Sequence, residues 1–279
     1  MKKVYLANES SQTTGGGWSF ISNIKLGLKD NVAFVDNVDD CDIYFISGAT
    51  MVTRNQVVQA KSKGKKIVLR VDNIPRDSRN RNTGTSRLRD FAKLADLIIY
   101  QSKWCKEYVG GWLKRDGAVI INGVDTSVFN PNGNKVGKMG SPQYIYVRFN
   151  RDENKRWEEA WYHYQMISRR NPNASLWIVG KFSPEQIEYN FDFYNKEKFS
   201  YWGIVKKEMM ATLLRSADVL LYPYYNDACS NTLLEAMASG TKIDTLDSGL
   251  SGGSPEIIKC KDTSLERMSN EYLKEFEKI

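Results

Sequence analysis

The chain has 279 residues, of which 41% are hydrophobic and 26% charged, and its net charge is +7. It is long enough to bury one large core or two of ordinary size, and no hydrophobic run approaches the length that crosses a bilayer. The four cysteines are widely spaced and His163 is the one histidine, which argues against a disulfide framework and against a zinc site of the usual ligands. We expect a cytoplasmic protein, because the N-terminus lacks a signal-peptide core.

The positive charge favours anionic partners. Basic clusters occupy residues 61–66 and 76–89. We interpret them as a solvated face and a polar loop rather than a nucleic-acid surface, because no interleaved aromatic residues or nucleic-acid motif accompany them. No specific nucleic-acid partner is therefore expected.

The first half of the chain alternates hydrophobic strands with amphipathic helices. Gly15, Gly16 and Gly17 lie between the first strand and the first helix, where a backbone without side chains can approach a phosphate or sugar. Such alternation predicts a parallel, doubly wound sheet that binds ligands at the carboxyl ends of its strands. The predicted strands are 3–7, 32–35, 43–47, 66–71, 97–101 and 118–121, and the helices are 18–28, 53–63, 87–94 and 103–109.

The alternation stops at residues 131–142, which are rich in turn formers and are interpreted as a linker. It then resumes with strands 144–147, 176–179, 199–202, 219–222 and 242–246, and helices 157–169, 207–215, 232–239 and 264–279. We therefore predict an N-terminal domain, 1–130, a C-terminal domain, 143–262, and a last segment, 263–279, that packs back across a cleft between them. Small-molecule sites usually lie in such clefts.

The stretch from Asp227 to Gly240 carries the strongest local signal for a site. Asp227 and Glu235 flank a loop-to-helix junction, and the junction offers backbone N–H groups at Ser230, Asn231 and Thr232. Helix N-termini favour phosphate, and carboxylates accept hydrogen bonds from sugar hydroxyls, so the stretch suits a sugar phosphate. An ordinary capped helix of an α/β domain is the alternative at this point.

Ordered blocks along the chain carry a family resemblance. They are Ala95-Asp96-Leu97-Ile98-Ile99 with Ser102, Ile121-Asn122-Gly123-Val124-Asp125 with Phe129 and Pro131, Arg148 with Lys155, residues 199–205 and 217–223, Glu235-Ala236-Met237-Ala238-Ser239-Gly240-Thr241, and Gly252-Gly253-Ser254-Pro255-Glu256. In this order they resemble the retaining glycosyltransferases of family 4. The resemblance implies the GT-B fold, in which two doubly wound Rossmann-like domains face a central cleft.

Some positions depart from the family pattern. Asp227 stands where the family has the first of two glutamates, Ser230 replaces a glycine of that loop, and Arg156 stands where a glycine follows the lysine. The chain is also short for the family, which suggests a trimmed acceptor region like that of some virus-encoded members.

The resemblance implies a role for each matching residue. Arg148 and Lys155 would bind the donor diphosphate, Asp227 would hold hydroxyls of the transferred sugar, and Glu235 would bind the ribose. The other donor contacts implied are Gly16, Gly17, Ile204, Val205, Ser230, Asn231 and Thr232.

We therefore expect a retaining, metal-independent hexosyltransferase without a cofactor. Its donor would be a nucleotide sugar, with GDP-mannose slightly favoured over UDP-glucose, and its acceptor a glycan, glycoprotein or glycolipid. The one Asp-x-Asp triplet, Asp40-Cys41-Asp42, is interpreted as solvated loop acids rather than a metal site. The alternatives are a nucleotide-sugar epimerase or phosphorylase of the same fold, or a non-catalytic nucleic-acid-directed relative, and a homodimer is a candidate assembly.

Overall fold

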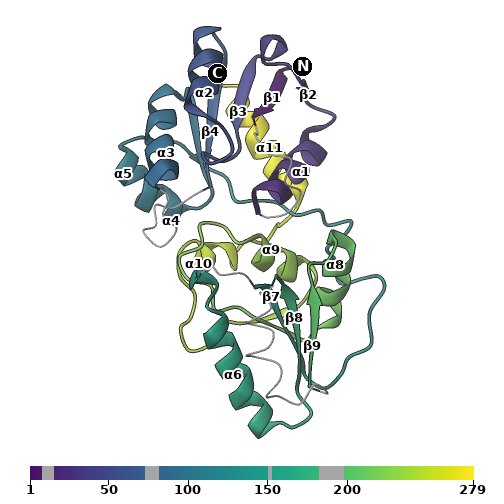
Figure 1. Cartoon of the computed structure of the whole chain (residues 1–279). Helices are drawn as coiled ribbons and strands as arrows, with labels where there is room; N and C mark the ends of the chain where they lie inside the picture. The colour runs from purple at the N-terminus through teal and green to yellow at the C-terminus, as the bar shows by residue number, and fades with distance from the viewer. Residues whose placement is uncertain (8–15, 73–81, 150–152, 182–197) are drawn as a thin grey trace. The chain divides into compact units, whose positions relative to one another are not determined.

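The computed structural model describes residues 1–7, 16–72, 82–149, 153–181 and 198–279 (Figure 1). The chain forms two compact units. The first contains Met1–Gly123 and Cys260–Ile279, and the second contains Val124–Lys259. Each unit is built around its own parallel sheet.

The first unit has a six-stranded sheet in the order β2-β1-β3-β4-β5-β6, and every neighbouring pair is parallel. All four residues of β3 are buried, as expected for a strand covered by helices on both faces. The strands are β1 (Lys3–Ala7), β2 (Ala33–Phe34), β3 (Ile43–Ile46), β4 (Lys66–Val71), β5 (Leu97–Tyr100) and β6 (Ala118–Val119).

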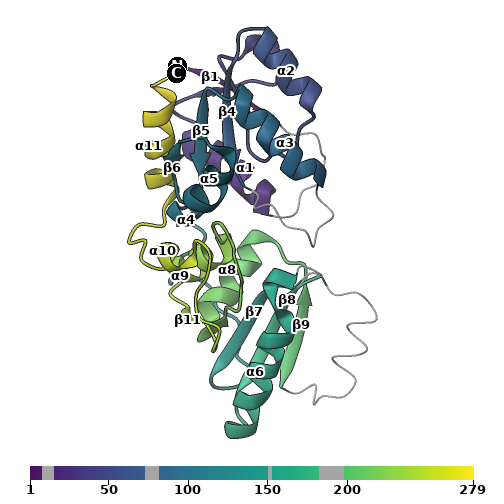
Figure 2. The same ribbon diagram turned by 90° about the vertical axis from the view of Figure 1, so that its left-hand side faces the viewer.

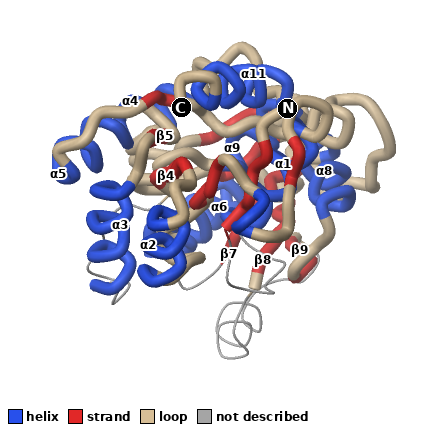
Figure 3. Tube along the Cα trace, turned by 90° about the horizontal axis from the view of Figure 1, so that it is seen from above, coloured by secondary structure: helices blue, strands red, loops and turns tan. Residues whose placement is uncertain are grey.

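Helices cover both faces of this sheet. On one face, α2 (Arg54–Ser62) and α3 (Asn82–Leu94) lie side by side (Figure 3). Thr53 starts α2 with a capping box, because its hydroxyl accepts from Gln56 N while the Gln56 side chain accepts from Thr53 N. The predicted helix 103–109 continues to residue 113 as α4 (Lys103–Cys105), a π-helical turn η3 (Lys106–Gly110) and α5 (Gly111–Leu113).

The C-terminal helix belongs to the first unit. Helices α1 (Gly16–Leu28) and α11 (Leu265–Phe276) contact each other on the face opposite α2 and α3 (Figure 2). Met268, Tyr272 and Phe276 of α11 join Phe20 and Phe45 in one buried hydrophobic cluster. The apolar stripe predicted for the last helix therefore completes the core of the unit that begins the chain.

The chain leaves the first unit next to the place where it returns. Arg267 of α11 donates to the carbonyl oxygens of Ile121 and Asn122, at 2.7 and 2.8 Å. Asn23 Nδ2 donates to Gly123 O at 3.0 Å. A Cβ on Gly123 would lie 2.5 Å from Ser264 O, so the absence of a side chain permits this close contact.

The second unit has a five-stranded parallel sheet in the order β11-β10-β7-β8-β9. The chain enters at the centre, moves outward to β9, and then returns to the other side of β7. The strands are β7 (Gln143–Phe149), β8 (Ser175–Gly180), β9 (Phe199–Gly203), β10 (Val219–Leu221) and β11 (Lys242–Asp244), and the helices are α6 (Trp157–Arg170), α8 (Lys207–Ser216), α9 (Asn231–Ala238) and α10 (Ser254–Ile257).

Aromatic residues of α6 pack on the centre of this sheet. The ring centroids of Trp157 and Tyr146 are 5.1 Å apart, and those of Tyr164 and Tyr144 are 6.3 Å apart. Trp161 meets the ring of Phe199 edge-on at 5.7 Å. These contacts fix the start of α6 beside the end of β7.

The residues interpreted as a linker, 131–142, belong to the second unit instead. Val136 N donates to Ser216 Oγ at 3.0 Å, Met139 N donates to Gln143 Oε1 at 3.1 Å, and Lys138 forms an ion pair with Asp218 at 2.6 Å. The segment has few hydrophobic residues, and polar side chains hold its backbone in place. The units join at Gly123/Val124 and Lys259/Cys260, which moves the predicted boundaries at 130 and 262.

No helix in the described part of the chain combines the length and the hydrophobicity needed to cross a membrane.

Candidate functional site

The strand order of the second unit reverses between β7 and β10, and crevices at such points bind ligands at the carboxyl ends of strands. Lys155 ends a short 3₁₀ turn, η4 (Glu153–Lys155), that follows β7, and Asp227 lies in the loop that follows β10. Lys155 Nζ donates to Asp227 Oδ2 at 2.7 Å. The fold therefore brings together two of the predicted site residues at the reversal.

Tyrosines hold this ion pair in a largely enclosed setting. The side chains of Lys155 and Asp227 are only 11% and 20% exposed. Lys155 Nζ lies 4.0 Å from the ring centroid of Tyr224, whose hydroxyl donates to Val147 O. The hydroxyl of Tyr146 donates to Lys155 O at 2.9 Å. The cation therefore has both a carboxylate and an aromatic face as partners.

A third tyrosine connects this site to residues 252–256, which we call the glycine-rich block. Tyr222 shares a hydrogen bond with Ser254 Oγ at 2.9 Å, and its ring centroid lies 4.5 Å from that of Tyr224. Burial, together with the negative charge of Asp227, raises the pKa of Tyr222 well above its usual value. Tyr222 is therefore a neutral hydroxyl beside the carboxylate.

The glycine-rich block clamps the loop of Asp227. Gly253 N donates to Asp227 O at 2.8 Å, and Cys229 N donates to Asp227 Oδ1 at 3.2 Å. Gly252 has a φ of 64°. Asn226, with a φ of 48°, donates its N–H to Ser251 Oγ at 2.9 Å. Both the main chain and the side chain of Asp227 are thus fixed before any ligand arrives.

Helix α9 starts four residues after Asp227 and carries the remaining predicted residues of this loop. Ser230 is its N-cap and accepts from Leu233 N at 3.3 Å. Asn231 and Thr232 form the first turn, where backbone N–H groups lack intrahelical acceptors and the dipole favours an anion. Thr232 Oγ1 is buried and has no hydrogen-bond partner among the described residues. Glu235 follows one turn later and is half-buried.

Other predicted residues lie elsewhere. Ile204 and Val205 follow β9, the edge strand beyond β8, and Ile204 is 63% exposed. Gly16 and Gly17 form the first turn of α1 in the first unit. Arg148 is in β7, but its side chain is outside the described residues.

The Asp-x-Asp triplet also lies in the first unit. Asp42 Oδ2 accepts a hydrogen bond from Lys3 N at 2.8 Å. Across the described ranges, no three His, Cys, Asp or Glu residues cluster closely enough to hold a metal ion.

The tyrosines that contact Lys155 were not predicted from the sequence. The available signal was the run Tyr222-Pro223-Tyr224-Tyr225, which follows a buried strand and ends two residues before Asp227. A run of this kind is common in hydrophobic cores as well, so it does not indicate a site without the strand order.

Comparison with protein families gives a match in the second half of the chain. Residues 145–270 match the family model described as Glycosyl transferases group 1. The match is shorter than half of the chain, and it contains Lys155, Asp227 and the whole of α9. A comparison with curated proteins found no match.

Solved structures match nearly the whole chain. HepE from Anabaena, solved in complex with UDP-glucose, has a TM-score of 0.71 at 12% identity and covers 100% of this chain and 90% of its own. The chain has the GT-B fold. AviGT4, a glycosyltransferase involved in avilamycin A biosynthesis, has a TM-score of 0.66 at 16% identity. The match covers 100% of this chain and 98% of AviGT4. A Listeria monocytogenes protein described as a UDP-N-acetylglucosamine 2-epimerase has a TM-score of 0.59 at 13% identity. The match covers 99% of this chain and 88% of the Listeria protein.

These identities show the fold alone, and the GT-B fold hosts both glycosyltransferases and epimerases among these neighbours. The predicted fold class, two parallel-sheet α/β units of GT-B type, is confirmed.

Proposed function

We propose that this protein is a retaining, metal-independent glycosyltransferase that moves a hexose from a nucleotide sugar to a glycan or glycoconjugate. The observation that carries the proposal is the Lys155–Asp227 ion pair at the strand-order reversal, followed directly by the N-terminus of α9. The cation and the helix N-terminus suit the diphosphate of a nucleotide sugar, and the carboxylate suits the hydroxyls of its sugar. The matched family model supports the assignment to glycosyl transferases.

Transfer from a nucleotide sugar breaks the bond between the anomeric carbon and the diphosphate, so negative charge grows on the leaving oxygens. Lys155 Nζ donates to Asp227 and so keeps the carboxylate in place. We assign the positive charge of Lys155 to the phosphate oxygens beside it. We assign the same task, stabilising the negative charge on the leaving diphosphate, to Arg148 and to the N–H groups of Asn231 and Thr232. Loss of one such donor lowers the rate by about 10²–10³.

The two acids are assigned different tasks. Asp227 accepts hydrogen bonds from hydroxyls of the transferred sugar, because it is fixed beside the phosphate-binding cation. Glu235, one helical turn into α9, accepts from the ribose hydroxyls. We retain the donor contacts that the family resemblance implies for Gly16, Gly17, Ile204 and Val205.

Two donors are in competition. The resemblance of the sequence blocks favours GDP-mannose, whereas HepE was solved with UDP-glucose. Isothermal titration with UDP, GDP, UDP-glucose and GDP-mannose decides between them. We expect one nucleotide sugar to bind, and failure of a wider panel of nucleotide sugars to bind would contradict the proposal.

The same titration, together with an assay of sugar transfer, tests the residue assignments. Glu235→Ala should abolish donor binding, whereas Asp227→Ala should retain nucleotide binding and lower turnover. Glu266→Ala, on the exposed face of α11, is the matched control and should behave like the wild type. Intact activity in both site variants would overturn the assignments.

An epimerase remains the second candidate, because one neighbour of the same fold is described as one. Incubation with the donor but without an acceptor separates the two activities: an epimerase converts the sugar while it stays on the nucleotide. Retention is checked by the anomeric configuration of the transferred sugar, measured by NMR.

A further inference from the structure

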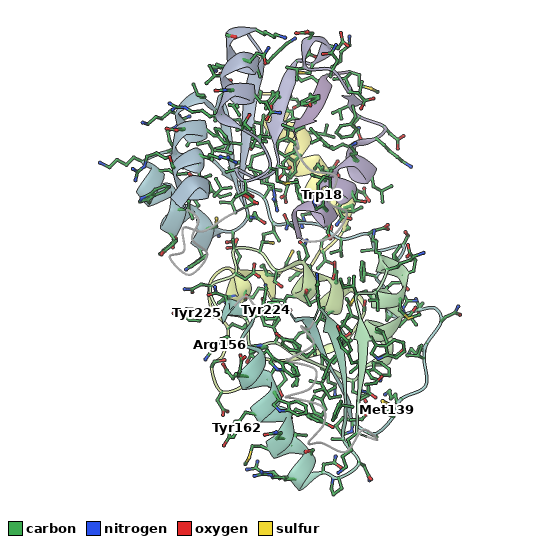
Figure 4. All side chains as sticks on the ribbon, viewed as in Figure 1. Trp18, Met139, Arg156, Tyr162, Tyr224 and Tyr225 are labelled. Carbon is green, nitrogen blue, oxygen red and sulfur yellow. The ribbon has the colours of Figure 1, made fainter. Side chains whose placement is uncertain are left out.

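Two cation–tyrosine pairs lie side by side at the start of α6. The inner pair is Lys155 and Tyr224. The outer pair is formed by the next residue in each segment, Arg156 and Tyr225, both labelled in Figure 4. Arg156 Cζ lies 5.9 Å from the ring centroid of Tyr225. Tyr225 N donates to Asn154 O at 2.8 Å and keeps the two segments in register.

The inner pair is enclosed, but the outer pair reaches solvent. Tyr225 is 49% exposed, and the Arg156 side chain is 37% exposed. About half of Tyr225 therefore stays in contact with water after folding, although apolar surface of this kind gains from being covered. The ring is available to contact another molecule.

Backbone strain flanks the ion pair on both segments. Arg156, next to Lys155, has a φ of 50°, and Asn226, next to Asp227, has a φ of 48°. This left-handed region is unfavourable for an arginine and milder for an asparagine, and backbone strain concentrates at functional sites. Arginine is a costly choice at position 156, because glycine would adopt this backbone freely.

The charge of Arg156 is already balanced. Arg156 Nη2 lies 2.6 Å from Glu159 Oε2, and Glu159 is on the first turn of α6. This pair is locally neutral, in contrast to Lys155 and its phosphate-binding role. It offers N–H donors of Arg156 and the carboxylate oxygen of Glu159 other than the buried Oε2, beside a flat apolar ring. A neutral ring with hydroxyl groups on its rim matches that surface better than a phosphate does.

We propose that Tyr225, Arg156 and Glu159 form a subsite for the transferred sugar and help to select it. The pyranose lies with an apolar face on Tyr225, and its hydroxyls hydrogen-bond to Arg156 and Glu159. Asp227 contacts the same sugar from two residues further along the chain. This subsite rests on the proposed function, because it requires a nucleotide sugar at Lys155.

The test compares each nucleoside diphosphate with its nucleotide sugar by isothermal titration, using Arg156→Gly and Tyr225→Ala. We expect both variants to bind the nucleotide sugar about tenfold more weakly, which corresponds to losing a hydrogen bond or a ring contact. Affinity for the nucleoside diphosphate should stay at the wild-type level. Arg156→Gly should also raise the denaturant midpoint, because glycine relieves the strained φ.

Lys114→Gly is the matched control, because Lys114 is also a cation with a left-handed backbone, at a φ of 54°, but lies in the first unit. It should raise the midpoint similarly and leave the affinity for the nucleotide sugar unchanged.

Unchanged binding of the nucleotide sugar by Arg156→Gly and Tyr225→Ala would overturn the subsite and leave the glycosyltransferase proposal standing. If Arg156→Gly lost affinity equally for the nucleoside diphosphate and the nucleotide sugar, Arg156 would be a phosphate contact. That result would also overturn the subsite. If the wild type binds no nucleotide sugar, both proposals fail together.

Discussion

Gly252 lies against the backbone of Asp227 so closely that a Cβ would stand 2.6 Å from Asp227 O and 2.8 Å from Asp227 N. The hydrogen bond from Gly253 N to Asp227 O closes the same contact. The glycine-rich block and the acidic loop therefore behave as one rigid element, and the position of the carboxylate depends on a residue 25 positions away, as the paired Asn226–Ser251 contact also indicates.

Gly252→Ala should displace the Asp227 loop. Its φ of 64° already disfavours a side chain, and the clash with Asp227 adds to that cost. We expect a loss of about 1–3 kcal/mol in the free energy of unfolding and a fall in transferase activity. Gly249→Ala is the control, because Gly249 has a φ of 66° and open space around its Cβ. Equal effects of the two substitutions on activity would contradict the clamp.

Lys155→Met should remove most of the catalytic rate, by about 10²–10³, because the leaving diphosphate loses a donor. It also leaves the Asp227 carboxylate, which is 20% exposed, without its cation. We expect the free energy of unfolding to fall by about 1–3 kcal/mol in urea denaturation. The double variant Lys155→Met/Asp227→Asn should recover stability without recovering turnover. A double variant no more stable than the single one would show that the ion pair does not compensate the buried carboxylate.

Asp125 should make the second unit sensitive to acid. Burial raises the pKa of Asp125, but hydrogen bonds from Ser127 and Lys207 and the charge of Lys207 outweigh it and lower the pKa below its usual 3.8. Because the folded pKa is the lower one, Asp125 stabilises the fold above the unfolded pKa, and the effect is lost as the pH falls through the folded pKa. Asp125→Asn should cost about 1–2 kcal/mol in the free energy of unfolding at pH 7. A difference from wild type that grows on acidification would disprove the assignment.

Gly123→Ala should loosen α11 from the first unit. The new Cβ would lie 2.5 Å from Ser264 O, 2.9 Å from Met268 Cβ and 3.0 Å from Leu265 Cα. Two of these atoms are in the backbone, so relief requires movement of the helix, and hydrogen exchange in residues 265–276 should rise. Gly111→Ala, whose Cβ meets nothing within 4 Å, should leave that exchange unchanged and stabilise its helix by up to about 1 kcal/mol. Unchanged protection of α11 in Gly123→Ala would contradict the contact.

Local patterns in the sequence were sufficient to find most elements. The strand predicted at 3–7 is β1, and the helices predicted at 157–169 and 207–215 differ from α6 and α8 by one residue. Asp227, Ser230 and Glu235 were predicted as site residues from the same kind of local pattern, and their roles stay predictions. A buried strand, a loop of acids and small polar residues, and a helix start all lie within one short stretch. Hydrophobic periodicity and capping depend on near neighbours, which the sequence contains.

Long-range decisions needed the tertiary structure. Residues 131–142 contain the turn formers typical of a linker, yet Ser216 and Asp218, far along the chain, hold them in the second unit. The apolar stripe of α11 predicts a partner, but not that Phe20 and Phe45 are that partner.

The sequence by itself determined the alternation of strands and helices, the order of the motif blocks and the acids of the Asp227 loop. Only the tertiary structure decided that β10 pairs with β7, and so that Lys155 reaches Asp227 at 2.7 Å. The physical reason is that strand order depends on how the connecting helices cover the two faces of the sheet. This packing joins residues far apart in the chain, and local periodicity in the sequence does not show which of them meet.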